Sequence, residues 1–186
     1  MMNAYELPTS LCIGGASYDI RTDFRAVLDV LMAVNDPELD DEAKAIVMLQ
    51  IMFVDVEQIP VEHLGEACQK VCEFIDCGQK EDGTPKPRLI DWQQDASIIV
   101  PAVNSVAHTE IRALPHLHWW TFLGYFMQIG EGLMSSVISI RQKKAKHAKL
   151  EKWEEDFYKE NKTLVDLKTV ETEEQRAEKE SILKWL

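Results

Sequence analysis

Two groups of side chains have the residue types that bind metal ions. His116 and His118 are closely spaced, but residues i and i+2 point about 200° apart on a helix. Cys68 and Cys72 lie one helical turn apart, with His63 a further turn back. Structural zinc sites repeat such a pair, whereas cysteines on an apolar helical face are usually small core residues. We therefore expect no metal site and no cofactor, and interpret the two histidines as helix-start or packing residues.

The sequence carries none of the motifs that mark common enzyme active sites. It has no phosphate-binding glycine loop, no nucleophile elbow and no kinase signature. Asp91 and Asp95 lie one turn apart at a predicted helix start, where carboxylates cap the backbone and favour the helix dipole. We expect no catalytic residues and a protein that is not an enzyme.

A basic run, Arg141 to Lys149, carries five positive charges and no acid. It is followed by an acidic segment over residues 151–156. On one continuous helix, such segments could pair across copies of the chain or bind a charged helical partner. A basic helix can also contact phosphates, but a net charge of −12 argues against general nucleic-acid affinity. The candidate partner-binding residues here are Arg141, Lys143, Lys144 and Lys146.

Five aromatic residues are concentrated between Trp119 and Phe126. Trp119, Phe122 and Phe126 form one helical stripe, and Trp120 begins a second stripe beside it. A helix that is apolar over most of its circumference is buried on several sides, by its own domain or by another copy. We expect one tryptophan in the core and the other nearer an interface or a second core layer. Trp119, Trp120 and Phe122 are therefore candidate partner-binding residues.

The remaining pattern predicts a mostly α-helical protein, a helical bundle with a small N-terminal β-hairpin and a long C-terminal helical arm. Gly14-Gly15 between apolar alternations indicates the hairpin. In the arm, residues 133–186, the side chains of Trp153 and Phe157 lie on a thin apolar stripe. They are further candidates for partner contact. We expect a core domain over residues 1–132 and the arm over residues 133–186. The arm either protrudes and mediates self-association or partner contact, or folds back on the helices of residues 22–77 and completes the bundle. Helices are predicted to begin at Thr22-Asp23, Asp40-Asp41, Pro60, Asp91, Pro115, Gly132 and Thr172.

Charge and hydropathy limit where such a protein can act. Residues 1–80 have a net charge of −10, residues 81–150 of +2 and residues 151–186 of −4. No segment approaches the roughly 18 uninterrupted apolar residues that a membrane span needs, and the N-terminus lacks the basic flank of a secretory signal. We expect a cytosolic protein without membrane or nucleic-acid partners.

Three segments together resemble the bacteriophage "gp fifteen" family. They are Asp91-Trp-Gln-Gln-Asp95, Leu117-His-Trp-Trp120 with Phe122, and Ser139-Ile-Arg-Gln-Lys143. The lysine-rich helix with Lys152-Trp-Glu and Phe157-Tyr158 is similar to the longer members. The resemblance covers roughly residues 5–165. These are proteins of long-tailed phages and prophages of Gram-positive bacteria, encoded beside the tape-measure gene and regarded as tail assembly chaperones.

The resemblance implies a function that needs no catalytic residue. The protein would bind and solubilise the tape-measure protein in the host cytoplasm, be displaced by tail tube subunits, and be missing from the mature virion. From the charge pattern and the apolar helix we also expect it to self-associate. The alternatives are a structural protein retained in the tail and a nucleic-acid binder that uses residues 141–149.

Overall fold

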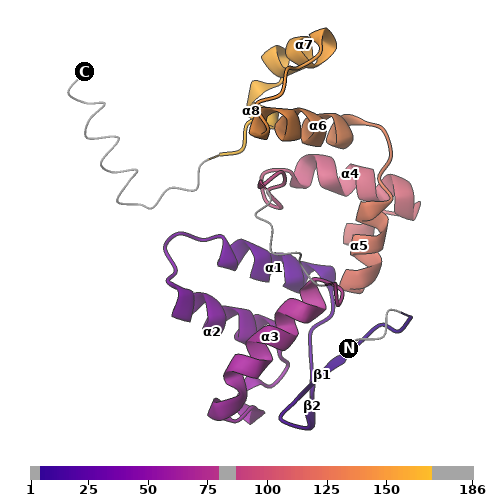
Figure 1. Cartoon of the computed structure of the whole chain (residues 1–186). Helices are drawn as coiled ribbons and strands as arrows, with labels where there is room; N and C mark the ends of the chain where they lie inside the picture. The colour runs from indigo at the N-terminus through magenta and orange to yellow at the C-terminus, as the bar shows by residue number, and fades with distance from the viewer. Residues whose placement is uncertain (1–4, 80–86, 169–186) are drawn as a thin grey trace, which may run out of the picture.

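The computed structural model describes residues 5–79 and 87–168. A β-hairpin is followed by helices, which confirms the predicted mostly α-helical fold (Figure 1). The first half comprises β1 (Ser10–Ile13), β2 (Ala16–Asp19), α1 (Phe24–Val34), α2 (Asp41–Met52), η1 (Val56–Gln58), η2 (Val61–His63) and α3 (Leu64–Ile75). The second half comprises α4 (Ala96–Ala107), η3 (Ile111–Ala113), α5 (Trp119–Met127), α6 (Leu133–Ala145), α7 (Lys152–Glu160) and α8 (Lys162–Val165).

The hairpin turns at the two glycines, as predicted. Gly14 and Gly15 have φ angles of 56° and 83°, a conformation that suits glycine because other residues have a Cβ that clashes there. The strands pair with Leu11 opposite Tyr18. Leu11 is buried, and the hairpin packs on α3, where the backbone N–H of Gly14 donates to Glu66 Oε2 at 3.0 Å. The hairpin therefore extends the core of the first half of the chain.

The first helix caps also lie where the sequence places them. The side chain of Asp23 accepts from the backbone N–H of Arg25, and that of Asp40 accepts from Ala43. The predicted start at Asp91 is wrong by one turn. Its carboxylate instead accepts from two backbone N–H groups of the turn that precedes α4, which begins at Ala96.

Between Gly132 and residue 168 the chain forms three helices, so the prediction of one continuous helix from the basic run into the acidic segment is wrong. α6 ends at Ala145, and His147 then takes a left-handed conformation with φ 51°. α6 packs on α4, α8 packs on α6, and α7 lies at the end far from the hairpin (Figure 1). The division at residue 132 stays a prediction. The predicted helix from Thr172 lies outside the described residues.

One apolar core runs through both halves of the described chain. Val27 and Val30 of α1, Val103 of α4 and Val137 and Ile140 of α6 all belong to it. Within residues 5–79 and 87–168, no helix combines the length and apolar character that crossing a bilayer requires.

Candidate functional site

Two tryptophans at the start of α5 attach this helix to the end of α3. Trp119 is only 2 % exposed, and its indole N–H donates to the carbonyl oxygen of Ile75 at 2.8 Å. Trp120 is half-buried, and its indole N–H donates to the carbonyl oxygen of Phe74 at 2.8 Å. Trp119 therefore lies in the core, as expected for one of the two, and of the two places expected for the other, an interface or a second core layer, Trp120 takes the second.

Phe122 completes this part of the core. Its ring stacks on Phe24 with centroids 4.7 Å apart and on Trp119 with centroids 5.6 Å apart, and the side chain is almost fully buried. Trp119 and Phe122 therefore cannot reach a partner in this fold. Their proposed contact with a partner is corrected to a structural role, because a surface partner needs exposed side chains.

The two histidines hold the start of α5. His118 Nδ1 accepts from the backbone N–H of Trp120, so its Nε2 carries the proton and donates to the carbonyl oxygen of Pro8 at 3.0 Å. Burial lowers the pKa of His118, which favours this neutral form. His116 Nε2 lies 3.0 Å from the hydroxyl of Thr22. Each ring has its own partner, which agrees with the helix-start interpretation.

Arg141 forms a buried ion pair that the sequence analysis missed. Its guanidinium donates to both carboxylate oxygens of Asp95, at 2.6 and 2.8 Å. The same group donates to the carbonyl oxygens of Leu89, Leu164 and Val165, at 2.8, 2.9 and 2.7 Å. Arg141 thus joins α6 to the segment before α4 and to α8. It is a structural residue rather than a partner contact, because both ionic side chains are buried.

The element at residues 91–95 contacts both other segments that carry the family resemblance, through the Asp95–Arg141 pair and through Trp92. Trp92 lies against Trp119, with ring centroids 6.0 Å apart, and against Phe126, with centroids 5.1 Å apart. The side-chain amide of Gln94 donates to the carbonyl oxygen of Asp166 and accepts from the backbone N–H of Lys168. The acidic-aromatic element at residues 91–95 is therefore a junction between the middle and the end of the chain.

The central lysines of the basic run pair within their own chain. Lys143 Nζ donates to Glu154 Oε2 at 2.7 Å, and this hydrogen bond holds the pKa of the Glu154 carboxyl below its ordinary range. Lys144 Nζ contacts Asp166 and donates to the hydroxyl of Tyr158 at 2.6 Å. We expected these lysines to meet acidic groups of a neighbouring molecule. That expectation is corrected, because the acids come from the folded-back residues 151–166.

Two other candidates remain accessible. Trp153 is 52 % exposed, and its indole N–H donates to Glu151 Oε2 at 3.0 Å. Lys146 is exposed at the end of α6, and its amine has no hydrogen-bonding or ionic partner among residues 5–79 and 87–168. Phe157 is half-buried against the core. Of the nine residues proposed for partner contact, Trp153 and Lys146 are thus the exposed ones, with Trp120 and Phe157 partly covered.

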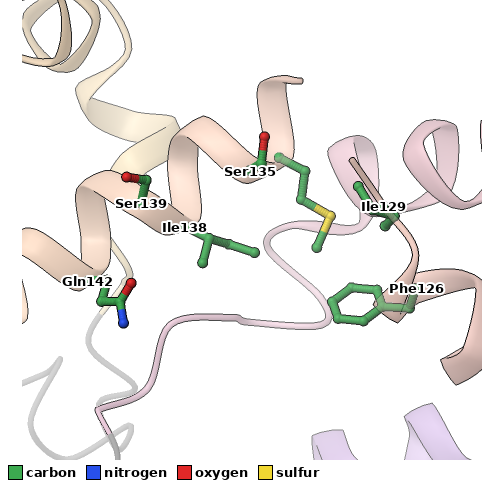
Figure 2. A pocket seen from close by; sticks show the side chains of 7 residues that line it. Phe126, Ile129, Ser135, Ile138, Ser139 and Gln142 are labelled. Atoms are coloured by element: carbon green, nitrogen blue, oxygen red, sulfur yellow. The ribbon is translucent and has the colours of Figure 1, made fainter. Parts of the chain in front are cut away.

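The connection between α5 and α6 lies between two apolar hollows. The larger, of about 310 Å³, separates this connection from α4, and the smaller, of about 260 Å³, lies along α6 (Figure 2). Ile129 and Met134 line both hollows. The larger is also lined by Ser97, Ile98, Pro101, Ala102, Ser105, Val106, Gly130, Glu131, Gly132 and Leu133, and the smaller by Phe126, Ser135, Ile138, Ser139 and Gln142.

This part of the chain is nearly free of charge. No Asp, Glu, Lys or Arg lies between Asp95 and Glu110, and Glu131 alone lies between Arg112 and Arg141, in a chain with 28 % charged residues. Met127 and Leu133, at the two ends of the connection, are 63 % and 48 % exposed. We call the larger hollow with Met127 and Leu133 the α5–α6 surface. Exposed apolar surface with few charges is typical of sites that bind other proteins.

The described residues offer little for other chemistry. Within residues 5–79 and 87–168, no three His, Cys, Asp or Glu side chains are grouped so that they could hold a metal ion. The four cysteines are free thiols, and burial raises the pKa of Cys77 to about 11, away from reactive values.

Comparison with known proteins agrees with the pattern of residues. The model of a family described as "Bacteriophage Gp15 protein" matches residues 4–167. Searches of curated proteins and of solved structures gave no match. Because the family model covers most of the chain, this protein belongs to the Bacteriophage Gp15 protein family and is a bacteriophage protein.

Proposed function

We propose that this protein is a tail assembly chaperone that binds and solubilises the phage tape-measure protein without catalysing a reaction. The α5–α6 surface carries the proposal, because Leu133 is exposed and lines an apolar hollow, and Met127 is exposed at the other end of a connection whose one charged residue is Glu131. A tape-measure protein is long and helical, with apolar patches that would aggregate before the tail tube surrounds them. An apolar hollow between helices suits an amphipathic helix of such a client.

Binding of this kind needs no energy source. A protein that binds an exposed segment shifts the client away from aggregation by mass action, and tail tube subunits that compete for the same segment release it. Met127 is exposed, and its flexible side chain can adapt to different apolar sequences. The net charge of −12 would keep the complex in solution. We place this activity in the host cytoplasm.

Co-expression with the tape-measure protein of the same phage, followed by a pull-down, tests the proposal. Leu133→Asp places a charge on the α5–α6 surface at a side chain that is already 48 % exposed, so the fold should be kept. Val61→Asp is the matched control, because Val61 is 81 % exposed in η2 and lies outside both hollows. We expect wild type and Val61→Asp to retain the client and Leu133→Asp to lose it. Equal retention by all three proteins would contradict the site, and no retention by wild type would contradict the function.

The alternative of a structural tail protein makes a different prediction for the finished particle. Mass spectrometry of purified virions should not detect a chaperone, whereas a structural protein would be present in stoichiometric amount. For nucleic-acid binding, the structure engages Arg141, Lys143 and Lys144 in ion pairs, which leaves little free positive charge in the basic run. We therefore expect no mobility shift of DNA or RNA at physiological salt.

A further inference from the structure

The smaller hollow has an apolar end and a polar end. Phe126 and Ile129 border one end and Gln142 the other, while Ile138 lies between them and Ser135 and Ser139 follow α6 (Figure 2). Gln142 is exposed, and its side-chain amide has no hydrogen-bonding partner among the described residues. An indole ring has the matching character, because it has a large apolar body and one N–H donor. The hollow is thus suited to a tryptophan side chain.

A free positive charge lies beyond the polar end. Residues three and four apart share a helical face, so Ile138, Gln142 and Lys146 follow one another along α6. The Lys146 amine is exposed and has no partner in the described part of the chain. A helix that places an apolar side chain in the hollow would therefore bind more tightly if it also carried an acidic residue about two turns away, which could pair with Lys146.

The chain itself presents such a side chain on α7. Trp153 is 52 % exposed, and Glu160 lies seven residues later on the same helical face. The Glu160 carboxylate is exposed and has no partner among residues 5–79 and 87–168. At 1.5 Å per residue, Trp153 and Glu160 are about 10 Å apart along the axis, close to the roughly 12 Å from Ile138 to Lys146.

We propose that α7 of one copy docks in the smaller hollow of a second copy, with Trp153 in the hollow and Glu160 paired with Lys146. The two helices are parallel in this arrangement, because Trp153 precedes Glu160 on α7 and the hollow residue Ile138 precedes Lys146 on α6. The indole N–H exchanges its bond to Glu151 for one to Gln142. This contact joins two different surfaces, so it forms either a ring or an open chain of copies.

Self-association of this kind bears on the proposed function without depending on it. Ile129 and Met134 line both hollows, so a docked second copy contacts side chains that also border the α5–α6 surface. Client binding and self-association would then compete, and the copies would separate as the client binds. The two claims have separate tests, since one is measured on the protein alone and the other with the tape-measure protein.

Sedimentation velocity of the full chain over a wide range of concentration tests the proposal. We expect wild type to associate and Trp153→Ser to raise the dissociation constant by about tenfold or more, as loss of a tryptophan anchor does. Val61→Ser, which removes an exposed apolar side chain elsewhere, should associate as wild type does. Circular dichroism checks that each variant is folded.

A charge exchange tests the pairing. Lys146→Glu and Glu160→Lys should each weaken association about two- to fivefold at low salt, and the double variant should restore it. These differences should vanish at high salt. A wild type that stays monomeric, a Trp153→Ser variant that associates normally, or a double variant weaker than both single variants would overturn the proposal. Association that appears only after removal of residues 169–186 would also overturn it, because the hollow's occupant would then be the chain's own C-terminus.

Discussion

Removal of the Arg141 guanidinium should destabilise the protein strongly. Arg141→Met keeps most of the side-chain volume but leaves the Asp95 carboxylate buried with one backbone N–H donor, that of Asp91. It also removes the donor from three carbonyl oxygens, those of residues 89, 164 and 165. Breaking a buried ion pair by removing one partner costs about 3–5 kcal/mol. For a chain of this size, the melting temperature should fall by about 6–20 °C.

Urea unfolding followed by circular dichroism measures this change. The exposed pair between Arg112 and Glu110 provides the control, since Arg112→Met should leave the unfolding midpoint unchanged. The double variant Asp95→Leu with Arg141→Met should recover part of the loss, because it leaves no buried charge. A loss below about 1 kcal/mol for Arg141→Met would refute the reasoning that this pair holds α6, α8 and the segment before α4 together.

Three further predictions concern other parts of the fold. Trp119→Ala should lower the free energy of unfolding by about 3–5 kcal/mol, and wild-type stability in urea would show that this side chain is not a core anchor. Gly14→Ala should lower the free energy of unfolding by about 1–2 kcal/mol, because the residue has φ 56° and the added Cβ would lie 2.6 Å from His63 Nε2. An unchanged urea midpoint would contradict this. The hydrogen bond from Lys143 lowers the pKa of Glu154 in the folded protein, so the ionised carboxylate stabilises the fold above pH 4.5, and this contribution is lost as the pH falls further. Glu154→Gln should therefore flatten the dependence of stability on pH in an acid titration, and an unchanged pH profile would count against this pairing.

Local features of the fold could be predicted from the sequence because neighbouring residues determine them. Two glycines between alternating apolar residues indicated the hairpin, and Asp23 and Asp40 indicated the first two helix starts. The double apolar stripe of α5 predicted that Trp119 and Trp120 would lie in different layers. Each of these predictions depends on spacing within about ten residues.

Contacts between distant residues could not be predicted in this way. Asp95 and Arg141 are 46 residues apart, and each has a sufficient local interpretation, as a helix cap and as part of a basic face. The end of α6 was missed because no glycine or proline marks it. His147 takes the left-handed conformation instead, and the chain then folds back so that Glu154 meets Lys143. The exposed α5–α6 surface was also missed, since apolar residues alone do not distinguish a core from a binding site.

The amount of tape-measure protein that stays soluble tests the central claim most directly. The client is expressed alone, with the wild-type protein, with Leu133→Asp and with Val61→Asp, and its soluble fraction is measured after centrifugation. We predict that wild type and Val61→Asp keep the client soluble, while Leu133→Asp leaves it as aggregated as when it is expressed alone. A client that is equally soluble with and without the wild-type protein would contradict the proposed chaperone function.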